Sequence, residues 1–324
     1  MSLRIVEQVA LSDVGRQRSS NEDSYFQGSP LFAVADGMGG AQAGEVASSI
    51  AVKTVGELME GSWDTPEGRL VEIATEANRR IHELSQRDSS RQGMGCTLTV
   101  AFVGDGEVTI GHVGDSRAYR LRDGSFEQLT NDHSLVEELV RQGKLTAEEA
   151  EVHPQRSIIT RALGPEGEVE VDAFTHAAKP GDLYLLCSDG LTGMVPDERI
   201  CEILGGDSPL SEAASTLIGA ANDNGGRDNI TVVLFRLGSG EDGEGDDLGG
   251  TQVDLTADQV RDAAAMTKPA DVQETVPRDT QKTAPRETVT SATAVTGGAA
   301  AAEREVDDFT RVGTPTLEAP PPEP

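Results

Sequence analysis

The sequence predicts an α+β fold in which an antiparallel sheet or sandwich is covered by helices. Short β-branched runs alternate with amphipathic stretches from residue 2 to about residue 237. Two pairs of these runs are separated only by Gly104-Asp105-Gly106 and by Asp123-Gly124, which are turn sequences typical of β-hairpins. Consecutive hairpins with helices grouped between them favour antiparallel layers over a doubly wound parallel sheet.

The predicted strands are short and apolar. The first hairpin joins residues 97–103 to 107–113, and the second joins residues 117–122 to 125–129. Further apolar runs at residues 31–35, 183–188 and 230–235 predict buried strands.

Four segments have the apolar spacing of amphipathic helices. They are residues 45–59, 66–85, 197–204 and 209–221. In the second, Leu70, Ile73, Ala77, Ile81 and Leu84 recur at the three- and four-residue spacing of one helix face. These helices would cover the predicted sheets.

The last quarter of the chain differs in composition. Beyond Gly238 the residues are mainly Gly, Asp, Glu, Thr, Pro and Ala, and Phe309 is the only aromatic residue. Such a segment buries too little apolar surface to offset the entropy of ordering. We therefore expect a folded domain over residues 1–238 and a disordered acidic tail over residues 239–324, apart from a short helix near residues 257–266.

The formal net charge of -29 excludes several partners. Nucleic acids and anionic membranes bind clustered Lys and Arg, which this sequence lacks. A phosphate substrate stays open if metal ions supply the positive charge.

The three cysteines, Cys96, Cys187 and Cys201, are widely spaced in apolar stretches, which indicates reduced core residues. The first residues contain no apolar signal-peptide region, and no run of about 18 apolar residues could span a bilayer. We expect a cytoplasmic protein.

Four acidic residues stand where a strand end or turn would present a carboxylate. Asp36 and Asp189 each end an apolar run and precede glycine, Asp228 directly precedes the run at residues 230–235, and Glu22 lies in Asn21-Glu22-Asp23. Carboxylates with a glycine carbonyl suit a hard divalent ion such as Mg²⁺ or Mn²⁺.

Each motif also has a purely structural explanation. Asp105 and Asp123 fit hairpin turns only. Asp115, in Gly114-Asp115-Ser116-Arg117, fits either a capped bend or a further metal ligand at a strand end. Arg18 fits either a surface cation or a bidentate phosphate clamp beside the metals.

Other hydrolase classes lack their motifs. The five histidines have no zinc-ligand spacing, and no cysteine is followed six residues later by arginine, as a cysteine phosphatase requires. Gly-x-Ser-x-Gly and the P-loop sequence are also absent from the sequence.

The ordered combination of motifs resembles the metal-dependent protein serine/threonine phosphatases of type 2C, in their bacterial form. The motifs are Arg18-x-x-Asn21-Glu22-Asp23, Val34-Ala35-Asp36-Gly37-Met38-Gly39-Gly40, Gly114-Asp115-Ser116-Arg117, Cys187-Ser188-Asp189-Gly190 and Gly226-Arg227-Asp228-Asn229. The resemblance covers residues 5 to 237 and leaves the tail outside it.

The resemblance implies a central β-sandwich flanked by helical layers, with two Mn²⁺ or Mg²⁺ ions at one end. It implies that Asp36 bridges both ions, that Gly37 offers its carbonyl, and that Asp189 and Asp228 bind one ion. Glu22 would reach the second ion through water, and Asp115 with Asp189 would hold a weaker third ion. Arg18 would bind the phosphate.

The implied reaction is direct attack of a metal-activated water on phosphoserine or phosphothreonine in a protein, with no covalent intermediate. Residues 132–163 resemble the flap that lines the substrate approach. Met38 stands where many eukaryotic relatives have a histidine proposed as general acid, so a metal-bound water is the simplest proton donor.

The resemblance implies phosphorylated proteins as partners, namely serine/threonine kinases and their targets. The tail threonines lie beside acidic residues or proline, as at Thr275, Thr288 and Thr314, and a phosphothreonine-recognition domain could bind them once phosphorylated. Three alternatives stay open: an inactive binding module of the same fold, a scaffold whose main output is the tail, and a merely solubilising tail.

Overall fold

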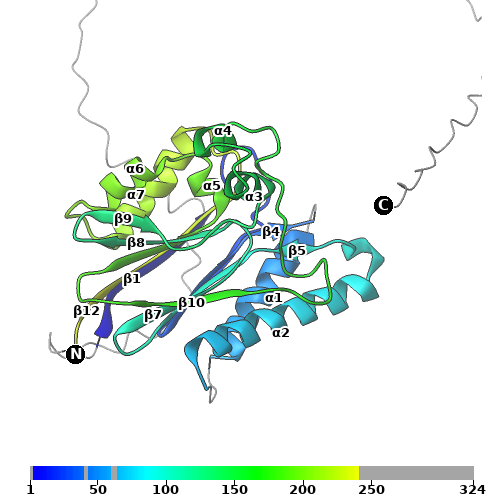
Figure 1. The fold of residues 1–324 in the computed structure, drawn as a ribbon, viewed down its shortest axis with the longest axis horizontal. Helices are drawn as coiled ribbons and strands as arrows, with labels where there is room; N and C mark the ends of the chain where they lie inside the picture. The colour runs from blue at the N-terminus through cyan, green and yellow to red at the C-terminus, as the bar shows by residue number, and fades with distance from the viewer. Residues whose placement is uncertain (1–2, 40–42, 60–63, 241–324) are drawn as a thin grey trace, which may run out of the picture. The chain divides into compact units, whose positions relative to one another are not determined.

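Two antiparallel β-sheets pack face to face at the centre of the protein (Figure 1). The computed structural model describes residues 3–39, 43–59 and 64–240. Sheet A has the spatial order β1 (Leu3–Asp13), β12 (Ile230–Ser239), β11 (Leu183–Cys187), β8 (Arg117–Arg122) and β9 (Ser125–Gln128). Sheet B has the order β10 (Asp172–Ala177), β7 (Glu107–Val113), β6 (Leu98–Val103), β3 (Leu31–Ala35) and β2 (Ser24–Gly28).

Helices cover the outer face of each sheet (Figure 1). Sheet B is covered by α1 (Ala43–Glu57) and α2 (Pro66–Arg87), which is followed by the short 3-10 turn η1 (Ser89–Arg91). Sheet A is covered by α5 (Asp189–Thr192), α6 (Asp197–Leu204) and α7 (Leu210–Asp223). Two more helices, α3 (Leu135–Arg141) and α4 (Ala147–Glu151), lie in the segment between β9 and β10. The α-β-β-α layering predicted from the sequence is confirmed.

Three apolar cores separate the four layers. Strand β11 shows why its sequence is uniformly apolar. Leu183, Leu185 and Cys187 pack against the helices over sheet A, whereas Tyr184 and Leu186 enter the core between the sheets. Because both faces of the strand are buried, neither set of alternating positions can be polar.

Stacked aromatic rings join the two sheets. The ring centroids of Phe32 in sheet B and Phe235 in sheet A lie 4.4 Å apart, and Tyr184 stacks on the same Phe235 ring at 5.0 Å. Burying each of these side chains stabilises the fold by about 2 to 3 kcal/mol. The stack fixes the distance between the sheets at whose ends the predicted site residues lie.

The helix starts follow the sequence. Thr65 caps α2, since its Oγ1 accepts a hydrogen bond from the Gly68 amide at 3.0 Å, and Pro66 occupies the first turn, where no intrahelical donor is needed. Leu70, Ile73 and Ile81 are fully or almost fully buried on the face toward sheet B. The predicted helix at residues 66–85 is confirmed, with an end two residues later.

Both predicted hairpins are present as β6–β7 in sheet B and β8–β9 in sheet A. Asp123 (φ 51°) and Gly124 (φ 79°) both have left-handed backbone at the second turn, as a two-residue hairpin loop requires. The two hairpins belong to different sheets, so the chain changes sheet between β7 and β8, at Asp115.

The structure contains one short strand that the sequence does not predict. Gly37 and Met38 form β4, which pairs with β5 (Gly95–Cys96). A Cβ at Gly37 would overlap the carbonyl groups of Gly44 and Glu22. The bare glycine allows three backbone segments to approach one another here.

Cys96 and Cys187 are buried, Cys201 is half-buried, and all three are free, as predicted. No helix within residues 3–39, 43–59 and 64–240 is long and apolar enough to cross a membrane. Almost all of the predicted tail, including its helix at residues 257–266 and its threonines, lies outside the described residues. The boundary at residue 238 therefore stays a prediction.

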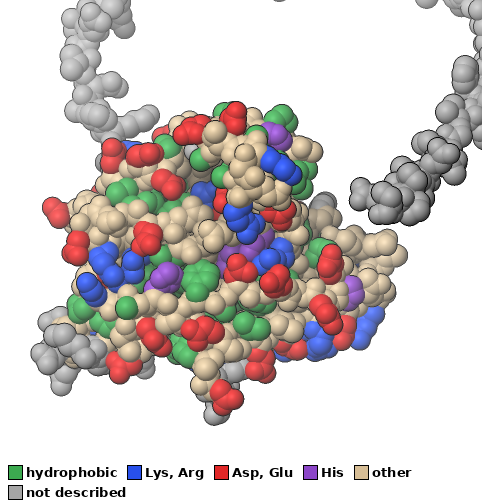
Figure 2. Space-filling view, viewed as in Figure 1, with side chains coloured by type: hydrophobic (Ala, Val, Ile, Leu, Met, Phe, Trp, Pro, Cys, Tyr) green, Lys and Arg blue, Asp and Glu red, His purple; other side chains and the backbone are tan. Residues whose placement is uncertain are grey.

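Acidic side chains are spread widely over the surface in Figure 2, with fewer basic ones among them. Many of the arginines are held in ion pairs, such as Arg79 with Glu83 and Arg199 with Glu202. Exposed pairs of this kind contribute little to stability, typically about 0 to 1 kcal/mol.

Candidate active site

Strand ends from both sheets converge at one end of the sandwich. Asp36 directly follows β3 of sheet B, and Asp189 begins α5, separated by one residue from the end of β11 of sheet A. Asp228 precedes β12 by one residue, and Asp115 lies at the crossing from β7 to β8. Residues that are far apart in the sequence therefore meet because the strands that carry them stack.

A pocket of about 510 Å³ lies where these strand ends meet. All seven residues predicted for the site line it: Arg18, Glu22, Asp36, Gly37, Asp115, Asp189 and Asp228. The remaining lining residues are Ser19, Ser20, Met38, Gly39, Ser157 and Ile159. The sequence motifs are thus brought together in one cavity.

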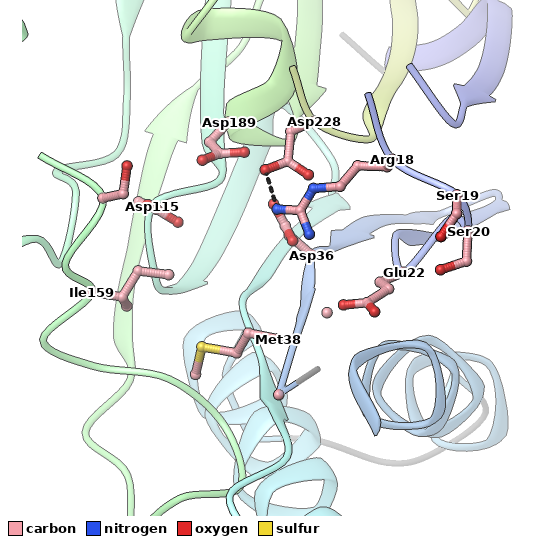
Figure 3. Close-up of a pocket in the computed structure, with 13 residues that line it drawn as sticks. Arg18, Ser19, Ser20, Glu22, Asp36, Met38, Asp115, Ile159, Asp189 and Asp228 are labelled. Carbon is pink, nitrogen blue, oxygen red and sulfur yellow. Dashed lines mark hydrogen bonds and ion pairs between the residues drawn. The ribbon is translucent and has the colours of Figure 1, made fainter. Parts of the chain in front are cut away.

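The acidic side chains are spread along the pocket. Figure 3 shows Asp36, Asp189 and Asp228 near its middle, with Asp115 to one side and Glu22 to the other. Within the described part of the chain, no three acidic, histidine or cysteine side chains stand close enough together to enclose an ion as they are placed. An ion bound here would also need the Gly37 carbonyl, water or small rotations of the carboxylates.

The carboxylates are poorly neutralised. Burial, reinforced by neighbouring carboxylates, raises the pKa of Asp36, Asp115 and Asp189 above the usual range of aspartate. One oxygen of Asp115 and one of Asp189 are buried without a hydrogen-bond partner. Oxygen ligands that lack both donors and counter-charges fit a divalent cation, so the residues present suit the Mn²⁺ or Mg²⁺ that the sequence predicts.

Arg18 is the cation nearest to this cluster. Its Nη2 donates to Oδ2 of Asp228 at 2.7 Å, drawn as the dashed line in Figure 3. This hydrogen bond, together with the charges of Glu22 and Asp36, raises the pKa of the Arg18 guanidinium. Arg18 lies in the loop between β1 and β2, and its side chain is 49% exposed, so its remaining donors are open to a ligand.

Asp36 is held in place through its backbone. Its amide donates to Oγ1 of Thr97 at 2.9 Å, and its carbonyl accepts from the Thr97 amide at 2.8 Å. Oγ1 of Thr97 also lies 2.8 Å from Oγ of Ser116, next to Asp115. These contacts fix two of the predicted ligands relative to each other.

The sequence motifs gave no role to Asp23. This residue is 9% exposed and supports the site through hydrogen bonds to residues beside it. Its Oδ2 accepts from Oγ of Ser188 and from Oγ1 of Thr231, each at 2.7 Å. Ser188 lies between β11 and Asp189, and Thr231 belongs to β12. Asp23, directly before β2, therefore connects the start of that strand to the end of β11 and to β12. The signal was present in the Asn21-Glu22-Asp23 run, since a second acidic residue beside a ligand often supports it.

The predicted flap, residues 132–163, closes one wall of the pocket through Ser157 and Ile159. A buried histidine pair attaches the flap to the sandwich. The ring centroids of His112 in β7 and His133 in the flap lie 4.8 Å apart, and the His112 Nε2 donates to the Asn131 carbonyl at 3.1 Å. Burial lowers the pKa of His112 to about 3, so this imidazole is neutral.

Comparison with known proteins agrees with this geometry. The family model described as protein phosphatase 2C matches residues 15–205. The serine/threonine phosphatase stp of Listeria monocytogenes is 45% identical over 237 residues, which cover 69% of this chain and 92% of that protein.

Solved structures are similar as well. The serine/threonine phosphatase PstP/Ppp of Mycobacterium tuberculosis superposes with a TM-score of 0.67 at 42% identity, covering 74% of this chain and 100% of that one. A structure of the PstP catalytic domain in complex with 2 manganese ions has a TM-score of 0.67 at 39% identity and covers 74% of this chain and 99% of that one.

Proposed function

Because the chain belongs to the protein phosphatase 2C family and is a metal-dependent protein serine/threonine phosphatase, we propose that the pocket at the sandwich end is its catalytic centre. The observation that carries this proposal is the convergence of Asp36, Asp115 and Asp189, buried and poorly neutralised, beside the guanidinium of Arg18. The substrates are phosphoserine and phosphothreonine in proteins.

The acidic residues would hold two Mn²⁺ or Mg²⁺ ions. Asp36, near the middle of the pocket, would serve both ions, and the Gly37 carbonyl would be a further ligand. Asp189 and Asp228 would hold one ion, and Glu22 would reach the other through water. Asp115 would add a weaker third site with Asp189. Such a metal pair lowers the pKa of water and offsets the charge of the phosphate.

The chain's own groups supply orientation and charge. Arg18 presents planar, parallel N–H donors that match two phosphate oxygens, and it reaches the pocket from a loop outside both sheets. To bind phosphate fully, its guanidinium would leave Asp228, with which it pairs in the described structure. The flap residues Ser157 and Ile159 would narrow the approach and limit the water around the phosphate.

Among the residues that the structure describes, no histidine or cysteine lines the pocket to act as a phosphorylated nucleophile. Direct attack by water is proposed because the metal pair would activate it. Met38, which lines the pocket, has no proton to donate, so a water held at the metal site would be the simplest proton donor to the leaving alkoxide.

The cellular role that we propose is reversal of serine/threonine kinase signalling. The protein would act on phosphorylated kinases and their targets in the cytoplasm. The folded domain, residues 1–238, would carry the activity, and the acidic tail, residues 239–324, would be a regulatory segment that kinases phosphorylate.

Metal replacement tests the proposed centre. The protein would be stripped with a chelator, dialysed, and assayed on an aryl phosphate and a phosphothreonine peptide while Mn²⁺ or Mg²⁺ is restored. Turnover should be absent after stripping and return with the metal, and a variant lacking the Asp36 carboxylate should stay inactive. Full activity without added metal, confirmed by elemental analysis of the stripped protein, would exclude the proposed chemistry.

A further inference from the structure

The loop that carries Arg18 and Glu22 has no regular secondary structure of its own. Residues 14–23 lie between β1 and β2 and form turns, bends and irregular backbone, in contrast to Asp36, which directly follows β3, and Asp189, which begins α5. Something outside the loop must therefore fix the two side chains that it brings to the pocket.

Asn229 makes the contacts that could do this. Its Nδ2 donates to the carbonyl of Val14 at 3.0 Å and to the carbonyl of Ser20 at 2.9 Å. Its Oδ1 accepts from the amide of Glu22 at 2.8 Å. One side chain thus fastens the beginning of the loop, its middle beyond Arg18, and the backbone of Glu22 itself.

The chemistry of these contacts requires a carboxamide. Two acceptors and one donor must be satisfied from one side chain, and among short side chains only asparagine offers two donors and an acceptor in that arrangement. Asn229 is 3% exposed, so a partner left without its bond would find little water in compensation. Aspartate at this position would keep the bond from Glu22 and lose both donated bonds.

Asn229 is itself well anchored. It lies between Asp228 and β12, and its amide donates to Oδ1 of Asp228 at 2.9 Å. The Gly226 carbonyl supports the same loop by accepting from the amides of Arg16 and Gln17 at 2.7 and 3.1 Å. Hydrogen bonds therefore hold loop 14–23 against the segment that carries Asp228.

We propose that Asn229 is a positioning residue for the reaction, which sets the placement of Arg18 and Glu22 relative to Asp228 through loop 14–23. This inference rests on the proposed function for its catalytic consequence. Asn229 does not line the pocket and acts only through the residues that do.

The structure offers a matched control. Asn78 in α2 is 1% exposed and makes the same set of bonds elsewhere: its Oδ1 accepts from the Gly164 amide, and its Nδ2 donates to the carbonyls of Glu166 and Gly167. Asn78→Ala should destabilise the fold to a similar degree while leaving kinetics and metal affinity at wild-type values.

The kinetic test compares Asn229→Ala and Asn229→Asp with Asn78→Ala on a phosphothreonine peptide. We expect kcat/KM to fall roughly ten- to a hundredfold in both Asn229 variants, mainly because KM rises. A loss of this size is what displacing a binding group by about 1 Å produces. In an Arg18→Ala background the KM effect of Asn229→Ala should vanish, because the group that it positions is gone. Calorimetry should show weaker Mn²⁺ binding, by about 10- to 100-fold, unless Glu22 is also replaced.

Hydrogen exchange tests the loop without using activity. The amides of Arg16, Gln17 and Glu22 should exchange faster in Asn229→Ala and keep their wild-type rates in Asn78→Ala. Unchanged exchange rates would overturn the inference. It would also be overturned if the losses of kcat/KM and Mn²⁺ affinity caused by Asn229→Ala were just as large in the Arg18→Ala and Glu22→Ala backgrounds as in the wild type. If the wild type lacked metal-dependent turnover, the proposed function would fail, and the exchange rates alone would still decide whether Asn229 orders the loop.

Discussion

Arg18 Nη2 and Asp228 Oδ2 lie 2.7 Å apart, so the proposed phosphate clamp is paired with a proposed metal ligand. Both side chains are substantially exposed, at 49% and 32%, and the pair should contribute no more than about 1 kcal/mol to stability. A cation bound at Asp228 would replace the guanidinium there and release it toward phosphate. The two proposed roles are therefore linked through a single contact.

Arg18→Ala should raise KM for a phosphopeptide more than it lowers kcat, because a phosphate clamp contributes binding that is shared by ground and transition states. Loss of the competing guanidinium should leave Mn²⁺ affinity equal to or above that of the wild type. Steady-state kinetics and calorimetry measure both. A change confined to kcat would show that Arg18 acts in the transition state only.

Asp36→Asn and Asp189→Asn should each lower turnover by more than about 100-fold at saturating Mn²⁺. This is a larger loss than expected for replacing a residue that only hydrogen-bonds to a metal ligand. The metal-free fold should be unchanged or more stable, since burial already raises the pKa of both carboxyl groups and one charge is removed. Denaturant unfolding after chelation checks this. Activity of more than a few per cent would contradict the dinuclear assignment.

Asp115→Ala should raise the Mn²⁺ concentration needed for activity while leaving the two tighter sites filled. Asp115 lies to one side of the central carboxylates, and one of its oxygens lacks a hydrogen-bond partner. Both observations fit a ligand of a separate, weaker metal site. Calorimetry that counts the same number of ions in the variant and the wild type would exclude a third site at this position.

His112 should make the fold sensitive to acid. Its pKa is lowered to about 3 by burial and by His133, whereas the unfolded chain binds the proton near pH 6.5. The free energy of unfolding therefore keeps its full value with respect to His112 above about pH 6.5. It falls by about 1.4 kcal/mol per pH unit as the pH decreases from there toward 3.

Replacing His112 with glutamine should remove the part of the pH dependence of the unfolding free energy that this histidine causes, even though the variant is less stable at neutral pH. Urea unfolding of both proteins between pH 5 and pH 7.5, at constant Mn²⁺, gives the difference in slope. Parallel stability curves would show that the histidine is not buried in its neutral form.

Removal of residues 239–324 should leave aryl phosphate hydrolysis nearly unchanged and alter association with a cognate kinase. The tail carries 18 acidic and 7 basic residues, and its threonines stand beside acidic residues or proline. In cells that express Asp189→Asn, the full chain should accumulate tail phosphothreonine. No increase over wild type in phosphoproteomics would leave only a solubilising role.

Most of the site could be predicted because its ligands follow apolar strands. A strand buried on both faces is visible as an unbroken apolar run, and Asp36 and Asp189 stand where such runs end. In the sequence, Asn229 is recognisable only as the last residue of the motif Gly226-Arg227-Asp228-Asn229. Its importance lies in contacts with Val14 and Ser20, more than 200 residues away, which no local pattern contains.

The hairpins predicted an antiparallel sheet or sandwich covered by helices, and the family resemblance implied the flanked sandwich. The sheet to which each hairpin belongs was not predicted. Nothing in the sequence around Asp115 predicts that the chain changes sheet there, because the change depends on pairing with strands that are distant in the sequence, such as β8 with β11. The strand β4 was missed for a similar reason, because two residues are too few to show a period.

The place of β12 in sheet A has a consequence for biosynthesis. This strand is the last one described along the chain, yet it lies between β1, the first, and β11. A growing polypeptide cannot complete the sheet, or bring Asp228 to Asp36, until residues 230–239 have left the ribosome, and pairing over such sequence separation is slow. Translation that stops before this strand should therefore release no active phosphatase, whereas cleavage after it should spare the enzyme.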